Sequence, residues 1–246
     1  MLNFAGKTDV GRRRDVNQDC FYLRQLSDGA VLAILCDGMG GASGGQVASE
    51  TAVRTMAQRI LKDYRRDYKP VSIRHMLSSA MSAANSEVFA MARRNPALKG
   101  MGTTAIAALI REGTVYLLHV GDSRCYLIHE KGVRQMTRDH SMVQLLVDRG
   151  EITPEEAKYH PERHFITRAL GVGENLEADY LEESVPAGGW VLLCSDGLSN
   201  HLDEEDISSI ISGHTPAEGV KELVDRANVM GGTDNITAVL IENRGR

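Results

Sequence analysis

Five aspartates stand at the ends of short apolar runs, and their side chains are candidates for binding metal ions. They are Asp19, Asp37, Asp122, Asp196 and Asp234. Core strands that pack face to face bring their ends to common edges, so we expect several of these carboxylates to lie close together. Like charges about 4 Å apart repel by on the order of 1–4 kcal/mol per pair. Oxygen ligands of this kind select hard cations, so the pattern predicts bound Mg²⁺ or Mn²⁺.

A site of this composition predicts hydrolysis at phosphorus. Two hard ions a few ångströms apart can hold a shared hydroxide and activate it for in-line attack. Arg14 is the candidate phosphate ligand, because a guanidinium fork matches phosphate oxygens. No cysteine or serine stands beside a basic activator in these motifs, so we expect water to attack directly. Any one of the aspartates alone is better explained as a turn residue or a helix cap, and only their recurrence favours a metal site.

The stretch over residues 31–45, VLAILCDGMGGASGG, is the centre of the pattern. Its continuous apolar start predicts a strand buried on both faces. Five glycines follow Asp37 within residues 38–45, and they let the backbone turn sharply and approach a ligand. A Ser-Asp-Gly turn at residues 27–29 predicts a hairpin with a strand over residues 20–23. In an antiparallel hairpin, Asp19 at the start of the first strand meets Asp37 at the end of the second.

Helices and strands are predicted along the whole chain from the spacing of apolar residues. Helical spacing covers residues 44–61 and 72–94, and capping residues predict helices over 204–212 and from Thr215 to about residue 230. Short apolar runs predict an antiparallel meander of strands over residues 102–110, 115–120, 125–129 and 133–136. Further strands are expected over residues 176–185, 190–194 and 236–242.

Residues between these elements are assigned more loosely. A short helix is expected over 141–149 and a capping box at residues 153–156, within an exposed excursion of the domain at 150–166. His119 is expected to be a core histidine with satisfied hydrogen bonds. His140, His160 and His164 are better explained by surface or flap packing than as acids. Asn235 is expected to stabilise a turn.

Length and composition place the chain among ordinary globular proteins. It has 246 residues and a net charge of -5, so it lacks the basic footprint of a nucleic-acid-binding protein. No apolar run approaches the ~20 residues that cross a bilayer, and the N-terminal residues lack the apolar core of a signal peptide. The four cysteines form no CxxC pair and lie in apolar runs. We therefore expect one domain over residues 1–246, reduced thiols, a cytoplasmic location, and neither nucleic acid nor membrane as a partner.

Eight segments, in order along residues 8–240, resemble the motifs of one family. They are TDVGRRRDVNQD, LCDGMGGASGG, MGTT, HVGDSR, RDHS, HPERHFITRALG, CSDGL and TDNIT. Together they resemble the metal-dependent Ser/Thr protein phosphatases, the PPM or type 2C family, of the compact bacterial type. The resemblance implies an α+β fold with four αββα layers, in which helices flank a central sandwich of two antiparallel sheets.

The resemblance also implies roles for individual residues. Asp37 would bridge two ions, the carbonyl of Gly38 would bind one of them, and Asp196 and Asp234 would complete the pair. Asp19 would hold a metal or its water, and Asp122 would bind a third, weaker ion together with Asp196. Arg14 precedes Asp19 by the five residues expected of the phosphate-binding arginine, with Arg12 and Arg13 as fallback assignments. Residues 141–170 resemble the flap beside the site, which influences substrate choice.

One departure from the family concerns the proton for the leaving serine. Many eukaryotic members carry a histidine directly after the DG, where this chain has Met39. A thioether cannot donate a proton, so the proton must come from a metal-bound water or from a residue the sequence does not identify.

The expected activity is Mn²⁺- or Mg²⁺-dependent hydrolysis of phosphoserine and phosphothreonine in proteins by a monomer. It would reverse a eukaryotic-like Ser/Thr protein kinase. The alternatives are a small-molecule phosphohydrolase and a catalytically inactive phosphopeptide-binding regulator of the same fold.

Overall fold

The structure is a computed structural model, and it describes residues 1–245, apart from the side chains of residues 42 and 43. Its strands are β1 (Leu2–Asp9), β2 (Asp19–Gln25), β3 (Val31–Met39), β4 (Gly102–Thr103), β5 (Ala105–Arg111), β6 (Thr114–Val120), β7 (Arg124–His129), β8 (Gly132–Gln135), β9 (Asp179–Ser184), β10 (Trp190–Cys194) and β11 (Ile236–Asn243). Its α-helices are α1 (Gly41–Asp63), α2 (Pro70–Arg94), α3 (Met142–Asp148), α4 (Pro154–Ala157), α5 (Asp196–Ser199), α6 (Glu204–Ile211) and α7 (Pro216–Val229). A 3-10 turn, η1, covers Pro96–Leu98.

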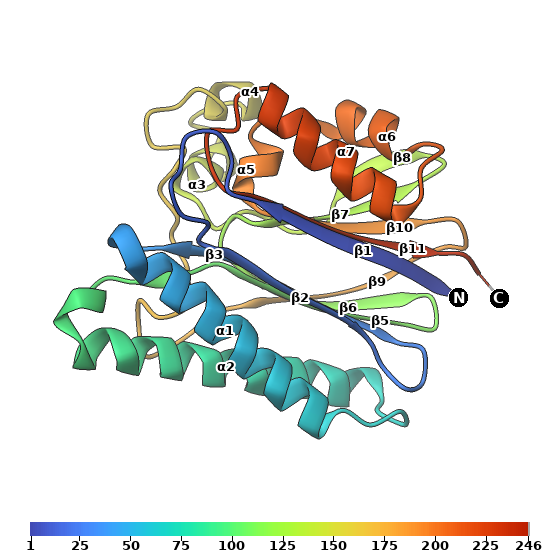
Figure 1. The fold of residues 1–246 in the computed structure, drawn as a ribbon, viewed down its shortest axis with the longest axis horizontal. Coiled ribbons are helices and arrows are strands. Elements are labelled where there is room, and N and C mark those ends of the chain that lie inside the picture. The colour runs from blue at the N-terminus through green and yellow to red at the C-terminus, as the bar shows by residue number, and fades with distance from the viewer. Residues whose placement is uncertain (246) are drawn as a thin grey trace.

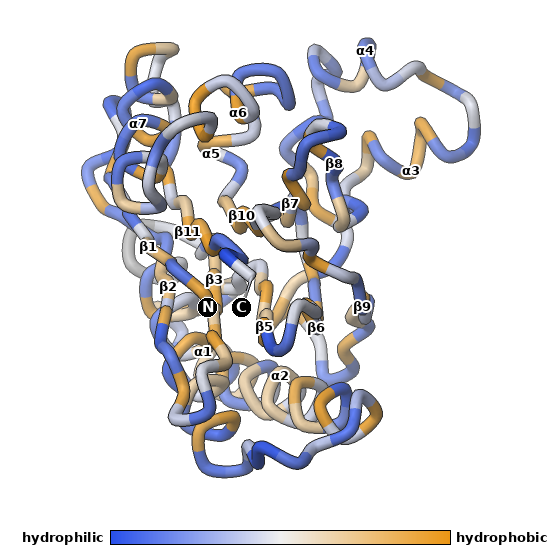
Figure 2. Tube along the Cα trace, turned by 90° about the vertical axis from the view of Figure 1, so that its right-hand side faces the viewer, coloured by the Kyte–Doolittle hydropathy of each residue, from blue (hydrophilic) through white to orange (hydrophobic). Residues whose placement is uncertain are grey.

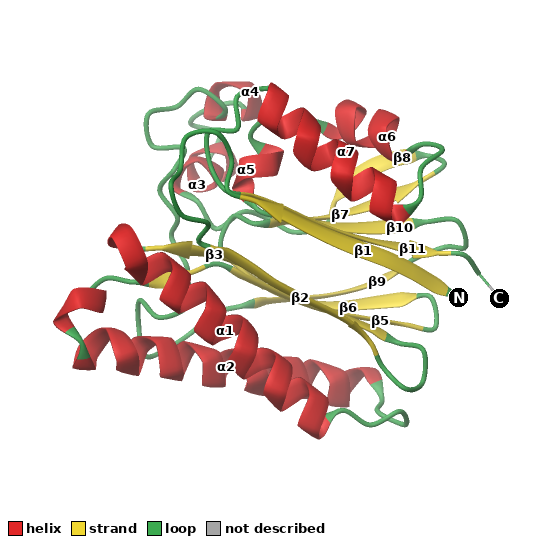
Figure 3. Cartoon of the chain, in the orientation of Figure 1, coloured by secondary structure: helices red, strands yellow, loops and turns green. Residues whose placement is uncertain are grey.

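The strands form two antiparallel sheets that pack face to face. One sheet has the order β1-β11-β10-β7-β8, and the other has the order β2-β3-β5-β6-β9, with β4 paired to β3. Helices α1 and α2 cover the outer face of the second sheet, and α6 and α7 cover the first (Figure 1; Figure 3). The expected four-layer αββα arrangement of an α+β fold is therefore confirmed.

Strand β3 shows why this arrangement suits the sequence. The side chains of residues 31–36 are all fully buried. Leu32, Ile34 and Cys36 pack in the layer under α1 and α2, whereas Val31, Ala33 and Leu35 pack between the sheets. Because both faces of this strand are covered, its apolar run is continuous rather than alternating.

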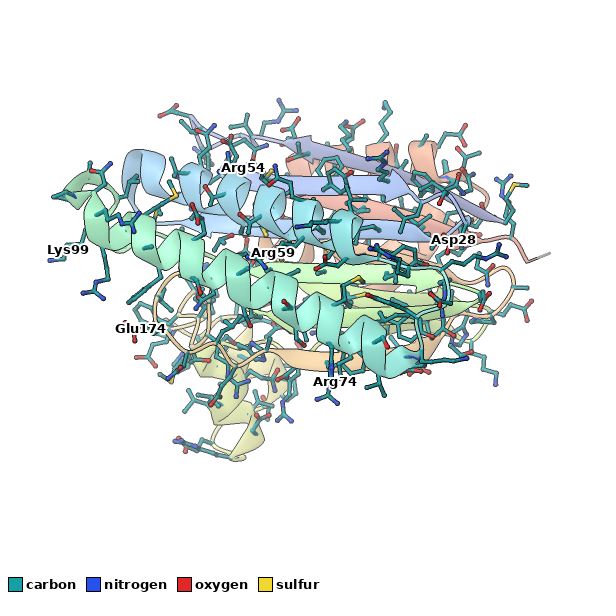
Figure 4. All side chains as sticks on the ribbon, turned by 90° about the horizontal axis from the view of Figure 1, so that it is seen from below. Asp28, Arg54, Arg59, Arg74, Lys99 and Glu174 are labelled. Atoms are coloured by element: carbon teal, nitrogen blue, oxygen red, sulfur yellow. The ribbon has the colours of Figure 1, made fainter. Side chains whose placement is uncertain are left out.

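Helices α1 and α2 are amphipathic, and their outer side faces solvent. Arg54 and Arg59 on α1 and Arg74 on α2 are exposed there (Figure 4). The inner side carries fully buried residues such as Met56 and Leu77. Capping boxes begin α4, α6 and α7, including the two expected at Thr153 and Thr215. No helix among the described residues is long and apolar enough to cross a membrane.

The meander expected over residues 102–136 is wrong in one respect. Strands β5 and β6 pair in one sheet, but β7 and β8 pair in the other, so the chain crosses between the sheets at residues 121–123. Gly121 makes the crossing with a φ of +108°, and a Cβ there would lie 2.6 Å from the Thr104 side chain. Glycine permits both this conformation and this close approach. The crossing carries Asp122.

The excursion near residue 150 forms a projecting flap. Figure 2 shows α3 and α4 standing away from the body of the sandwich. Two isolated bridges join this segment to its base, Ser141 to Ile166 and Leu170 to Thr103. The expected short helix over residues 141–149 is α3, which Ser141 caps by accepting a hydrogen bond from the Gln144 N–H.

Candidate metal centre

The predicted site residues converge at the end of the sandwich opposite the two termini. Strand β2 begins at this end and β3 ends there. The connections that lead into α5 and β11 lie at the same end (Figure 1). Asp19 and Asp37 are direct cross-strand partners in the β2–β3 ladder, as the hairpin predicted. Asp37 lies inside β3 rather than after it, because Gly38 and Met39 continue the strand by pairing with β4.

Asp19 is held by hydroxyl groups from the opposite sheet. Its side chain is 8% exposed, and Oδ2 accepts hydrogen bonds from Ser195 Oγ at 2.7 Å and Thr237 Oγ1 at 2.6 Å. The other oxygen, Oδ1, is buried without a hydrogen-bond partner among the described residues. Burial, with a smaller contribution from the charges of Asp196 and Asp234, raises the pKa of Asp19 to about 7, although the hydrogen bonds from Thr237 and Ser195 act to lower it. Burying a carboxylate oxygen without a hydrogen-bond partner lowers the stability of the folded protein, and such an oxygen is well suited to bind a cation.

Asp37 is the centre of the acidic group. Its backbone N–H donates to Thr104 Oγ1 at 3.0 Å, and its carbonyl accepts from the Thr103 hydroxyl at 2.8 Å, so the backbone is fixed on both sides. Desolvation raises the pKa of the Asp37 carboxyl well above its usual range. Repulsion raises it further, from Asp19, Asp196, Asp122 and Asp234. Asp37 therefore lies close to every other candidate carboxylate.

Asp196 and Asp234 come from the other sheet. Asp196 begins α5 directly after β10, within hydrogen-bonding reach of the Asp37 carboxyl, and burial followed by the charge of Asp234 raises its pKa. Asn200 Nδ2 donates to Asp196 Oδ2 at 3.1 Å. Asp234 Oδ1 accepts from the Asn235 N–H at 2.8 Å. Each side chain is oriented by a hydrogen bond from a residue of its own segment.

Asp122 lies on the crossing between the sheets and completes the group. Burial, followed by the charges of Asp196 and Asp139, raises its pKa to about 8. Asp122 and Asp196 repel each other, and the role of Asp122 as ligand of a third ion stays a prediction.

Gly38 is required by a close approach of two backbones. A Cβ on Gly38 would lie 2.0 Å from the Gly45 carbonyl oxygen and 2.8 Å from the Gln18 carbonyl oxygen. A Cβ on Gly45 would lie 2.7 Å from the Gly38 carbonyl oxygen. Gly40 and Gly41, with φ values of +116° and +60°, form the turn from β3 into α1. The glycine-rich segment therefore seats the start of α1 directly against the strand that carries Asp37.

Arg14 reaches the acidic group from the loop after β1. Its Nη2 donates to Asp234 Oδ2 at 2.8 Å, and the two side chains are partly exposed. In the part of the chain that the structure describes, Arg12 and Arg13 make no ion pair with a candidate ligand. Arg14 is therefore the arginine that faces the group.

The set of ligands fits hard cations, although it is not yet a closed cage. Within residues 1–245, no three Asp, Glu, His or Cys side chains are grouped closely enough to hold a metal ion as they stand. Asp234 turns toward Arg14, and Asp37 and Asp196 approach each other closely enough to share a hydrogen bond. The orphaned Asp19 Oδ1 and the mutual repulsion of the five carboxylates are both relieved by divalent ions with oxygen ligands. We conclude that these residues fit Mn²⁺ or Mg²⁺.

Comparison with known proteins assigns the family. The model of the family described as "Protein phosphatase 2C" matches residues 9–227. This chain belongs to the protein phosphatase 2C family.

Several relatives share nearly the whole chain. The serine/threonine phosphatase stp of Listeria monocytogenes is 38% identical over 237 residues, which cover 96% of this chain and 94% of that protein. The crystal structure of the Mycobacterium tuberculosis serine/threonine phosphatase PstP/Ppp aligns with a TM-score of 0.89 at 37% identity, covering 99% of each chain. A structure of the catalytic domain of PstP in complex with 2 manganese ions aligns with a TM-score of 0.85 at 36% identity, covering 98% of this chain and 97% of that one.

Several residues that support the site in this phosphatase 2C chain were not predicted. Ser195 and Thr237 bind Asp19, and Thr104 fixes the backbone of Asp37. Asn235, expected only to stabilise a turn, holds a distant loop: its side chain accepts from the Gln18 N–H at 2.8 Å and donates to the Val10 and Val16 carbonyls. Serine or threonine one residue from a candidate ligand is a weak signal, because it also occurs in ordinary turns.

The expectation that His119 is a satisfied core histidine is wrong. The residue is fully buried, but neither ring nitrogen has a hydrogen-bond partner among the described residues. It packs instead against the His140 ring, with centroids 4.8 Å apart. Burial lowers the pKa of His119 to about 4, so the ring is neutral at physiological pH. His140 is itself only 7% exposed, and its packing lies at the base of the flap.

The acidic group makes the stability of this phosphatase 2C chain depend on pH and metal. A folded-state pKa of about 7 for Asp19 and about 8 for Asp122, above the unfolded value of 3.8, means that the folded state binds more protons over this interval. Stability therefore falls as pH rises toward 8. His119 acts in the opposite direction, but only between about pH 4 and pH 6.5. Burial also lowers the pKa of His140, so both histidines oppose the aspartates mainly below pH 6.5, and the aspartates dominate from pH 6.5 to 8.

We expect the melting temperature of the metal-free protein to fall by a few degrees between pH 6.5 and pH 8, measured by scanning calorimetry. Saturating Mn²⁺ should remove this decrease, because it binds the ionised carboxylates. Asp19→Asn is the matched variant and should reduce the metal-free decrease, leaving the part due to Asp122. A melting temperature that stays constant or rises over this window without metal would contradict the assigned shifts.

Proposed function

We propose that this chain is a metal-dependent phosphatase that hydrolyses phosphoserine and phosphothreonine in proteins. The observation that carries the proposal is the convergence of five carboxylates from both sheets, with Arg14 beside them, at one end of the sandwich. Membership of the protein phosphatase 2C family and the printed names of its relatives support the same activity.

The proposed ligands divide into two groups. Asp37, Asp196, Asp234, Asp19 and the carbonyl of Gly38 would hold two Mn²⁺ or Mg²⁺ ions, and Asp122 with Asp196 would hold a third, weaker one. Bound there, such ions activate water for attack on phosphorus and neutralise the charge of the phosphoryl group. The catalytic-domain structure of PstP with 2 manganese ions supports the first two of these ions.

The residues of this chain supply binding and orientation. Arg14, which pairs with Asp234 in this structure, would bind the phosphoryl oxygens of the substrate through its guanidinium fork. Ser195 and Thr237 would keep Asp19 fixed as a hydrogen-bond acceptor through Oδ2, which leaves Oδ1 for the metal site. Met39 cannot protonate the leaving serine or threonine, so another donor must do so.

The wider setting is also part of the proposal. We place one phosphatase domain over residues 1–246, with residues of about 141–170 forming a flap that influences the choice of substrate. We also propose a monomer that acts against a Ser/Thr protein kinase in the cytoplasm. The four free cysteines fit the reducing compartment that this location implies.

The decisive experiment is hydrolysis of a phosphothreonine peptide with Mn²⁺, followed after addition of a chelator. We expect turnover that the chelator abolishes and that added Mn²⁺ restores. Turnover that survives complete chelation would overturn the metal-dependent mechanism. Efficient hydrolysis of small metabolite phosphates with no action on the peptide would instead support a small-molecule phosphohydrolase. Metal and peptide binding without turnover on any phosphomonoester, including an aryl phosphate, would identify a binding regulator.

A further inference from the structure

His140 joins two parts of the molecule that the proposed mechanism treats separately. Its backbone N–H donates to the Gly121 carbonyl at 2.8 Å, and its ring Nδ1 accepts from the Gly121 N–H at 3.1 Å. Gly121 precedes Asp122 directly, so the backbone and the side chain of one histidine both hold the loop that carries the proposed third ligand. An ion pair between Arg124 Nη2 and Asp139 Oδ2, at 2.7 Å, further joins the segment after Asp122 to the segment before His140.

The hydrogen bond from Gly121 fixes the tautomer of the ring. Because Nδ1 accepts a hydrogen bond from the Gly121 N–H, the proton of the neutral imidazole is on Nε2. Burial lowers the pKa of His140, which favours this neutral form. Nε2 can therefore donate to Asp179 Oδ2, 3.2 Å away on β9. Arg168 Nη1 donates to Asp179 Oδ1, also at 3.2 Å, and completes the chain of contacts.

The same residue lies where the flap leaves the sandwich. The His140 carbonyl accepts from the Thr167 N–H at 2.7 Å, and Ser141 bridges to Ile166. Thr167 and Arg168 form the returning end of the flap. Both ends of the flap are therefore held at His140, through its backbone and through the ring by way of Asp179. The fully buried His119 ring packs against the His140 ring, with centroids 4.8 Å apart, which leaves the imidazole little room to rotate.

We propose that His140 is a positioning residue that couples the base of the flap to the loop of Asp122, and so couples flap order to the affinity for the weaker ion. This inference rests on the proposed metal-dependent function. The ring is rigid and buried, so a shift of the flap base at Asp179 and Arg168 moves the Gly121 amide through a single side chain. Binding of an ion at Asp122 stabilises the flap base by the same link, because coupling between two sites is reciprocal.

Two substitutions test the Nδ1 and Nε2 hydrogen bonds of His140 separately. In His140→Asn, the amide oxygen takes the place of Nδ1 and keeps an acceptor for Gly121, but nothing reaches Asp179. In His140→Gln, the amide lies near the position of Nε2 and reaches Asp179, but the acceptor for Gly121 is lost. Asp179→Asn weakens the link from the far side without changing His140.

The readouts are Mn²⁺ binding by calorimetry and limited chymotrypsin digestion at Tyr159 and Phe165, which are exposed in the flap. In the wild type, we expect occupancy of the weak site to slow cleavage. His140→Gln should weaken that site roughly tenfold, as for other groups that orient a metal ligand, with the two tighter ions unchanged. His140→Asn and Asp179→Asn should lose most of the protection from cleavage, and they should weaken the third site only by the coupling itself, which is less than the loss in His140→Gln.

Wild-type affinity and wild-type protection in all three variants would overturn the coupling. Equal weakening of the third site in His140→Asn and His140→Gln would also overturn it, because the two ends of the ring would then have no separate roles. If the His140 variants do not fold, Asp179→Asn still decides the question. Hydrolysis of an aryl phosphate by the wild type tests the proposed function independently, since binding and digestion need no turnover.

Discussion

Asp37→Asn is expected to lower phosphatase turnover by about three orders of magnitude or more while the protein stays folded. The side chain lies near all four other candidate carboxylates, so its charge acts on every ion of the site. Loss of a central electrostatic group costs on the order of 10²–10³-fold in kcat in other enzymes, and loss of a shared metal ligand should cost at least as much. The measurement is kcat on an aryl phosphate and on a phosphothreonine peptide with saturating Mn²⁺.

The same substitution should leave the metal-free protein as stable as the wild type, or more stable. Desolvation and repulsion already favour the neutral Asp37 carboxyl, and asparagine has nearly its shape without the charge. Asp196→Asn should behave alike, whereas Asp67→Asn, on the exposed connection between α1 and α2, is the control and should keep full activity. A fully active Asp37→Asn protein with normal Mn²⁺ binding would disprove the assignment of the site.

Arg14→Ala is expected to reduce kcat/KM for a phosphopeptide by roughly 10- to 100-fold, mainly through KM. A bidentate contact between arginine and phosphate is among the stronger charge-assisted interactions, and Arg14 faces the acidic group through Asp234. Arg13→Ala, in the same exposed loop, is the matched control and should change kcat/KM less than twofold. Steady-state kinetics with one phosphothreonine peptide compares the two.

The reverse result would favour a fallback assignment. If Arg13→Ala or Arg12→Ala impaired the enzyme while Arg14→Ala did not, the Arg14–Asp234 pair would be an ion pair of the substrate-free protein only. Arg14→Lys refines the test, because lysine keeps the charge and loses the fork, so it should recover only part of the affinity.

The position of the site could be predicted because the candidate aspartates stand at the ends of apolar strands, and the ends of packed strands meet at common edges of the sandwich. The burial of residues 31–36 on both faces and the pairing of Asp19 with Asp37 follow from the hairpin pattern. The distances between carboxylates of different sheets could not be predicted, since they depend on the packing of the two sheets.

The failures of sequence reasoning have physical causes. Strand β1 was not predicted, because Gly6 and Lys7 weaken its pattern; it forms by pairing along its whole length with β11. The crossing at Gly121 was interpreted as an ordinary turn, since a Gly-Asp-Ser segment contains no signal that distinguishes one sheet from two. The sequence around His119 does not show that its ring lacks hydrogen-bond partners, because the partners of a buried ring come from residues far away in the sequence.

The crossing of ligands between the sheets has a consequence for assembly. Asp19 and Asp37 belong to one sheet, Asp196 and Asp234 follow or precede strands of the other, and Asp122 lies on the connection. Ions bound here would hold the two sheets together at this end of the sandwich, because their ligands come from both sheets. The hydrolytic machinery would then exist only in the fully docked molecule, and a chain with one sheet formed and the other still unfolded would be inert toward phosphoproteins.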